Sequence, residues 1–191
     1  ECTDTGCAVT QHVKIPRVYY AGVTNPGLTY NGKVQQPGLV LRDAAGNSLD
    51  PEIYSYYISS GKNVGLYPYR ITISSEKYSG TKKGTFSINP QGATIKKPSR
   101  GSRSCTAKWK KQKAKMSTSR ITGYQVMYST KSSFSDGKIK TVKGYKKTSC
   151  KIKKLKKKKK YYVKVRTYKT TSSGTCYSAW SKTKTVKTRY R

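Results

Sequence analysis

Short runs of alternating apolar and polar residues recur along this chain of 191 residues, and none of the intervening stretches has the length and period of a helix. The clearest run places Tyr161, Val163, Val165 and Thr167 on one face of an extended strand. Gly, Pro and Asn separate these runs, as expected at turns. The pattern predicts an all-β protein built from β-sandwiches.

The expected strands divide into two series. The first series lies within residues 11–20, 37–43, 54–58, 67–73 and 84–88, and the second within 104–109, 122–128, 138–142, 149–155, 161–167 and 177–188. Pro68 interrupts one run, and because proline cannot donate to a β ladder we expect it at a strand edge or a bulge.

Asn89-Pro90-Gln91-Gly92 separates the two series and predicts a domain boundary. We expect an N-terminal segment over residues 1–15, a first β-sandwich over 16–90 and a second over 91–191. The charge changes at the same point. Residues 1–90 carry nine Lys/Arg and six Asp/Glu, whereas residues 91–191 carry 32 Lys/Arg and only Asp136 as an acidic residue. The second domain therefore holds nearly all of the net charge of +34.

The lysine-rich run that precedes Tyr161 is expected to belong to a folded domain. Lysines up to Lys154 lie mainly on the face opposite Cys150 and Ile152, the solvated side of a strand, and residues 156–160 form the connection to the next strand. The run is thus predicted to be a basic rim and not a disordered tail.

Three sequence features of the second half resemble the fibronectin type III family over about residues 92–191. These are Trp109, the alternating run from Tyr124 to Tyr128, and Leu155 placed six residues before Tyr161. The resemblance implies a core containing Trp109, Tyr124, Leu155 and Tyr161. It also implies a tyrosine corner, in which the Tyr161 hydroxyl hydrogen-bonds the backbone upstream.

The run Tyr177-Ser-Ala-Trp-Ser181 resembles the last-strand motif of fibronectin domains in cytokine receptors. This resemblance implies a cation-π ladder of Lys164 and Arg166 over Trp180, with a role in stabilising the fold.

The lysine-rich sequence of this half is similar to that of fibronectin modules in secreted and surface proteins from Gram-positive gut clostridia. The first half also resembles a bacterial module, because residues 29–90 are similar to bacterial immunoglobulin-like repeats. Together these resemblances imply an extracellular, secreted or cell-wall-associated fragment of a larger protein, in keeping with a chain that starts at Glu1 and shows no signal peptide.

The five cysteines form no CxxC pair and His12 is the single histidine, so no metal site is expected. Cys2 and Cys7 could close a small loop in an oxidising compartment, whereas Cys105, Cys150 and Cys176 are expected to be mainly small core residues.

The sequence lacks the motifs of catalysis, such as a carboxylate pair, a metal cluster or a phosphate-binding glycine loop. We therefore expect neither an enzyme nor a cofactor. The chain also contains no run of about 18 apolar residues, so we expect no membrane span.

The basic second domain predicts attraction to polyanions. One interpretation is a structural and adhesive module pair that attaches to anionic cell-wall or host polymers, or to a host surface protein. The alternative is a dedicated carbohydrate- or polyanion-binding accessory module of a secreted enzyme. No motif for specific nucleic-acid binding is present, and solvation alone would also account for the lysines. The candidate binding residues are Lys153, Lys154, Lys156, Lys157, Lys158, Lys159 and Lys160, with Arg166 and Trp180 as a second patch.

Overall fold

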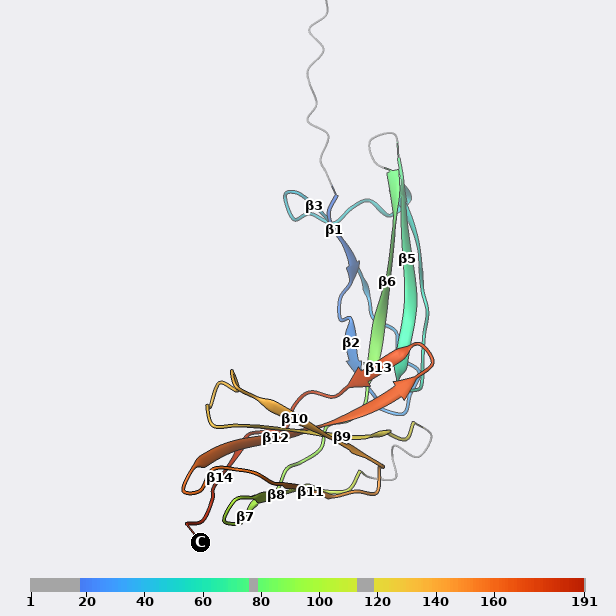
Figure 1. Ribbon diagram of the computed structural model, residues 1–191. Helices are drawn as coiled ribbons and strands as arrows, with labels where there is room; N and C mark the ends of the chain where they lie inside the picture. The colour runs from blue at the N-terminus through green and yellow to red at the C-terminus, as the bar shows by residue number, and fades with distance from the viewer. Residues whose placement is uncertain (1–17, 76–78, 113–118, 191) are drawn as a thin grey trace, which may run out of the picture.

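The computed structural model describes residues 18–75, 79–112 and 119–190, and in these ranges its regular elements are strands in two units, with one short 3-10 helix (Figure 1). The first unit contains β1 (Val18–Val23), β2 (Gly27–Thr29), β3 (Leu39–Asp43), β4 (Tyr54–Ile58), β5 (Gly65–Ser74) and β6 (Ser79–Asn89), with a short 3-10 helix η1 (Pro51–Ile53). The second unit contains β7 (Ser99–Arg100), β8 (Cys105–Lys108), β9 (Gly123–Ser129), β10 (Lys138–Lys143), β11 (Ser149–Ile152), β12 (Lys160–Thr171), β13 (Gly174–Tyr177) and β14 (Lys184–Lys187).

Each unit consists of two sheets, and the predicted all-β sandwich class is confirmed. In the first unit the pair β1-β3 faces a four-stranded sheet in the order β2-β6-β5-β4, in which β2 and β6 run parallel. In the second unit β11-β8-β7 faces a five-stranded sheet in the order β10-β9-β12-β13, and β14 also pairs with β12. The predicted domain boundaries remain predictions, and Cys2, Cys7, His12 and the segment 1–15 lie outside the described residues.

Pro68 lies within β5, which pairs with β6 without a break from Gly65 to Ser74, so the expected bulge is absent at this point. Strand β4 ends at Ile58, opposite Tyr69, and the Ser59 N–H then donates to the Pro68 carbonyl oxygen at 3.1 Å. Because N–H and C=O of one residue point to the same side of a strand, the missing donor of Pro68 faces the end of β4. The proline is tolerated where the neighbouring ladder ends, and not at an outer edge of the sheet.

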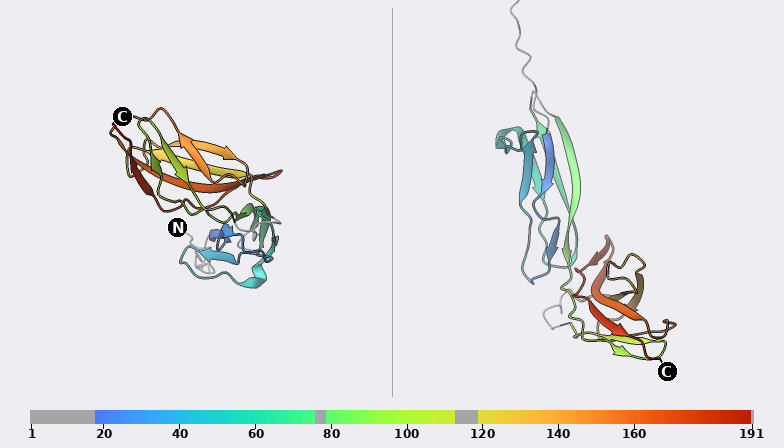
Figure 2. Two further views of the ribbon diagram at one scale, coloured as in Figure 1. Left: turned by 90° about the horizontal axis from the view of Figure 1, so that it is seen from below. Right: turned by 90° about the vertical axis from the view of Figure 1, so that its left-hand side faces the viewer.

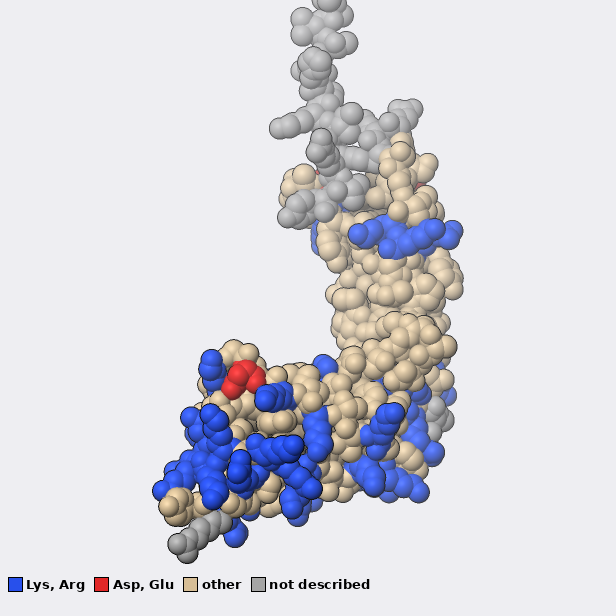
Figure 3. All heavy atoms as spheres, in the orientation of Figure 1, with Lys and Arg blue, Asp and Glu red and all other residues tan. Residues whose placement is uncertain are grey.

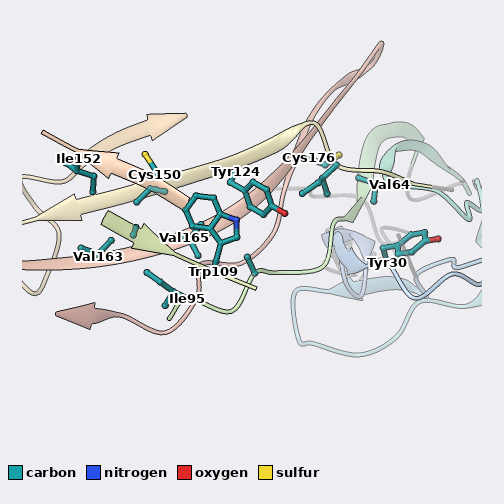
Figure 4. Close-up of a cluster of buried hydrophobic side chains, with 14 of the residues drawn as sticks. Tyr30, Val64, Ile95, Trp109, Tyr124, Cys150, Ile152, Val163, Val165 and Cys176 are labelled. Atoms are coloured by element: carbon teal, nitrogen blue, oxygen red, sulfur yellow. The ribbon is translucent and has the colours of Figure 1, made fainter. Parts of the chain in front are cut away.

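The core of the second unit is organised around Trp109 and Tyr124, whose rings lie 4.9 Å apart between centroids (Figure 4). Both rings are buried and both polar atoms are satisfied by backbone carbonyls. Trp109 Nε1 donates to the Lys147 oxygen at 3.0 Å, and the Tyr124 hydroxyl donates to the Tyr145 oxygen at 2.9 Å. Two large aromatic side chains can thus be buried without an unpaired donor.

The two units meet at an angle and share polar contacts (Figures 1 and 2). Gln91, in the connection, bonds to both: its Nε2 donates to the Tyr30 oxygen of the first unit at 3.1 Å, while its own carbonyl accepts from Gln112 Nε2 and Thr167 Oγ1 of the second unit, each at 2.9 Å. Nearby, the buried Ser119 hydroxyl accepts from the Val64 N–H at 2.7 Å. The connection between the units is therefore held by specific bonds.

Candidate functional site

The lysine-rich run forms a turn at one end of the second sandwich, between β11 and β12. Leu155 and Tyr161 are buried beneath it, and the backbone N–H of Lys156 donates to the Tyr161 hydroxyl oxygen at 3.0 Å. Lys154 and Lys158 both have positive φ angles, of 60° and 53°, in the left-handed region that tight turns require. We call residues 153–159 the lysine turn. Lys160, expected in the connection, is instead the first residue of β12.

The lysine turn is also tied to the segment that follows β14. The hydroxyl of the buried Thr188 donates to the Lys156 carbonyl at 2.7 Å and accepts from the Lys159 N–H at 3.0 Å. The Thr188 N–H donates to the Lys159 oxygen at 3.0 Å. The backbone of the turn is thus fixed from inside the protein, while its lysine side chains are exposed.

A groove of about 530 Å³ lies between the lysine turn and the end of β9. Its lining residues are Tyr128, Ser129, Thr130, Asp136, Lys138, Lys153, Lys154, Leu155, Lys156, Lys159 and Tyr161. Five of these are lysines, and basic side chains gather over this unit in the space-filling view, with a red area among them (Figure 3). The groove brings four of the seven candidate lysines to one place.

The other three candidate lysines, Lys157, Lys158 and Lys160, do not line the groove. Lys158 Nζ lies 3.9 Å from the centroid of the Tyr190 ring, and Lys160 Nζ lies 5.2 Å from that of Tyr162. Their ammonium groups extend the basic surface over neighbouring tyrosines.

Asp136 places a carboxylate in this basic groove. Its oxygens accept hydrogen bonds from the hydroxyls of Ser129 and Thr130, the latter at 2.7 Å. These bonds stabilise the ionised form and lower the pKa of Asp136 well below its usual range. The groove therefore combines several positive charges with one fixed negative charge.

A second group of side chains forms a cation-π ladder on the outer face of β12. Lys164 Nζ lies 4.0 Å from the Phe134 ring centroid and 5.3 Å from that of Trp180, and the Arg166 guanidinium lies 4.4 Å from Trp180 and 4.0 Å from Tyr177. The guanidinium also donates twice to Gln125 Oε1, at 2.9 and 2.7 Å. The cations of Lys164 and Arg166 thus alternate with three aromatic rings.

The segment between β13 and β14 explains why the expected single run over 177–188 is two strands. The hydroxyl oxygens of Ser178 and Ser181 accept hydrogen bonds from the backbone N–H groups of Thr167 and Val165, respectively, both at 3.0 Å. Their own N–H groups donate back to the carbonyls of the same residues. Side chains thus take the place of a regular ladder next to Trp180.

The three cysteines of the second unit, Cys105, Cys150 and Cys176, are buried and free. Burial raises the pKa of Cys105 to about 11, and it also raises the pKa values of Cys150 and Cys176. Such thiols are poor nucleophiles and weak ligands at neutral pH.

The described parts of the chain contain no group of three or more His, Cys, Asp or Glu that could hold a metal ion. Over the same ranges, no helix has the length and apolar character needed to cross a membrane.

Comparison with known protein families identifies the second unit. Residues 89–184 match the fibronectin type III domain, and the chain belongs to that family. Among solved structures it is similar to the fibronectin type-III domain of human fibronectin type III domain containing protein 3, at 23% identity, covering 54% of this chain and 89% of that chain with a TM-score of 0.42. It is also similar to the chicken CNTN1 FN1-FN3 domains, at 14% identity, covering 90% of this chain and 64% of that chain with a TM-score of 0.39. No curated protein matches it.

Sequence reasoning missed several members of both side-chain groups. Phe134 joins the ladder from the loop between β9 and β10, where its φ of 60° gives no recognisable pattern. Asp136 and Lys138 reach the groove from the same loop and the start of β10, far in sequence from the lysine turn. The one signal in the sequence was that Asp136 is the sole acidic residue after position 90.

Proposed function

We propose that this chain is a non-catalytic structural and attachment segment of a larger secreted or cell-surface bacterial protein, and that its second unit binds anionic polymers of a cell wall or host surface. The observation that carries the proposal is the groove, where Lys138, Lys153, Lys154, Lys156 and Lys159 surround one space. Fibronectin type III domains are typically extracellular structural modules, which fits this role. The resemblance of the first unit to bacterial immunoglobulin-like repeats supports a segment of tandem β-sandwich modules.

Electrostatics favours polyanions as partners. The second half carries 32 Lys/Arg against one acidic residue, and binding a polyanion there would release counterions. Lysine ammonium groups act as hydrated point charges and favour attraction with little base or shape discrimination. A host surface protein would need an acidic patch to use the same surface.

A binding comparison with the whole chain tests this function. The groove variant changes Lys153, Lys154, Lys156 and Lys159 to Gln, and a matched variant changes the exposed Lys96, Lys97, Lys108 and Lys110, which do not line the groove. Both variants remove four positive charges. We expect the groove variant to bind a sulfated polysaccharide at least about tenfold more weakly at low salt. Its salt dependence should also be shallower, by about one unit of slope for each lysine that no longer pairs with an anion.

Equal losses of affinity in the two variants would contradict a localised site and would leave only a general electrostatic coat. The second candidate function is a dedicated carbohydrate- or polyanion-binding accessory module of a secreted enzyme, and it is favoured by the groove, because four of the candidate lysines line it together. It predicts that one polymer class remains bound at near-physiological salt after the others of equal charge have dissociated.

A further inference from the structure

The groove is unusual in that it retains a carboxylate in a unit otherwise depleted of negative charge. Asp136 is the one acidic residue between positions 91 and 191, and it lies among the lysines of the groove. A surface evolved for attraction to any polyanion gains nothing from a negative charge at this point, because the carboxylate repels the ligand. Its position therefore bears on which anions fit.

The Asp136 carboxylate is held in place and ionised, as its bonds to the Ser129 and Thr130 hydroxyls show. A carboxylate offers about four acceptor positions, so positions remain for groups that approach from the groove. Asp136 is exposed, and these positions are accessible to a ligand. A hydroxyl group is the natural donor for them, and an anionic group is not.

Acidic polysaccharides combine the two required groups, because each repeating unit bears hydroxyls and the chain carries carboxylates or sulfates at intervals. Polyphosphate and DNA carry a charge on every unit and few or no free hydroxyls. The groove of about 530 Å³ is within the range of about 300–1,000 Å³ typical of ligand sites. It is thus large enough for one or two sugar rings.

We propose, on the basis of the function proposed above, that the groove is selective for acidic polysaccharides. The sulfate or carboxylate of the ligand contacts the ammonium groups of Lys153, Lys154 and Lys156, and a neighbouring sugar hydroxyl donates to Asp136. Asp136 is then a specificity-determining residue, because it accepts a hydrogen bond from polyanions that bear hydroxyls and repels polyanions that carry a charge on every unit.

The experiment compares chondroitin sulfate, sodium polyphosphate and a single-stranded oligo(dT) as probes, by titration calorimetry at about 0.15 M salt. The variant is Asp136→Asn, which keeps an oxygen acceptor for Ser129 or Thr130, and the control is Glu52→Gln, an exposed carboxylate of the first unit that undergoes the same charge change. We expect the unaltered chain to bind chondroitin sulfate at least tenfold more tightly than polyphosphate at equal charge concentration. Asp136→Asn should reduce this ratio at least threefold by strengthening the binding of polyphosphate, and Glu52→Gln should leave it unchanged.

A ligand-side measurement avoids any effect of the substitution on folding. O-methylated chondroitin sulfate keeps its sulfates but lacks hydroxyl donors, and we expect the unaltered chain to bind it no more tightly than polyphosphate. Equal affinity for the methylated and free polysaccharides, or an Asp136→Asn variant that strengthens all three probes by the same factor, would overturn the selectivity while the groove function stands. Loss of the function itself would appear separately, as polyanion binding that the four groove lysines do not affect.

Discussion

The hydroxyl oxygen of Tyr161 accepts a hydrogen bond from the Lys156 N–H at 3.0 Å, which connects the buried start of β12 to the middle of the lysine turn. The Tyr161→Phe substitution removes this acceptor and keeps the ring. We expect it to lower the free energy of unfolding by about 1 kcal/mol and to increase the amide exchange rate of Lys156. Chemical denaturation and hydrogen exchange measure the two effects. Tyr162→Phe is the control, and an equal loss there would argue against a special role for Tyr161.

The ladder on β12 predicts that Arg166 stabilises the fold through its shape as well as its charge. Arg166→Lys keeps the charge but removes the planar stacking between Trp180 and Tyr177 and the paired bonds to Gln125. We expect about 1–2 kcal/mol of destabilisation with polyanion binding unchanged. Thermal denaturation and the binding titration test both parts, with the exposed Arg100→Lys as control. Weaker binding without destabilisation would instead identify Arg166 as a ligand contact.

Burial of Cys105 predicts a specific alkaline instability. Its pKa is about 11 in the folded protein against an ordinary value of 9.0, so between these values the unfolded thiol ionises while the folded one remains protonated. The contribution of Cys105 to the free energy of unfolding is fully present below pH 9 and is lost as the pH rises toward 11. About 1 kcal/mol of it is lost between pH 8 and pH 10. Urea denaturation of the unaltered chain and of Cys105→Ala over this range isolates the contribution. Parallel pH dependences for the two proteins would exclude it.

The contact between Val64 and Ser119 predicts that the two units stabilise each other. Ser119→Ala leaves the buried Val64 N–H without its acceptor, at a cost of about 1–3 kcal/mol. We expect denaturation to begin at lower denaturant concentration and proteolysis between the units to accelerate. The exposed Ser132→Ala substitution should change neither. Unaltered stability in Ser119→Ala would mean that water replaces the missing bond.

The strands and the faces of the second unit could be predicted because alternation determines which side chains share a face. Val163 and Val165 point into the core for this reason, and the spacing of Leu155 and Tyr161 identifies the turn that holds the lysines. The groove could not be predicted, since it depends on how the β9–β10 loop approaches that turn. The contacts of Gln91 could not be predicted either, because no sequence pattern distinguishes a linker glutamine that bonds to both units from one that is exposed to solvent.

The parallel pairing of β2 with β6 determines how the first unit would respond to mechanical tension. The chain enters this pair at Gly27 and leaves it at Asn89, so a pull along the chain draws the two strands in opposite directions along their lengths. The hydrogen bonds between them are then loaded together in shear and cannot open one after another, as they would if peeled from one end. The first unit would resist unfolding under a pull on its two ends, and the covalent backbone through Gln91 would carry the load onward into the second unit.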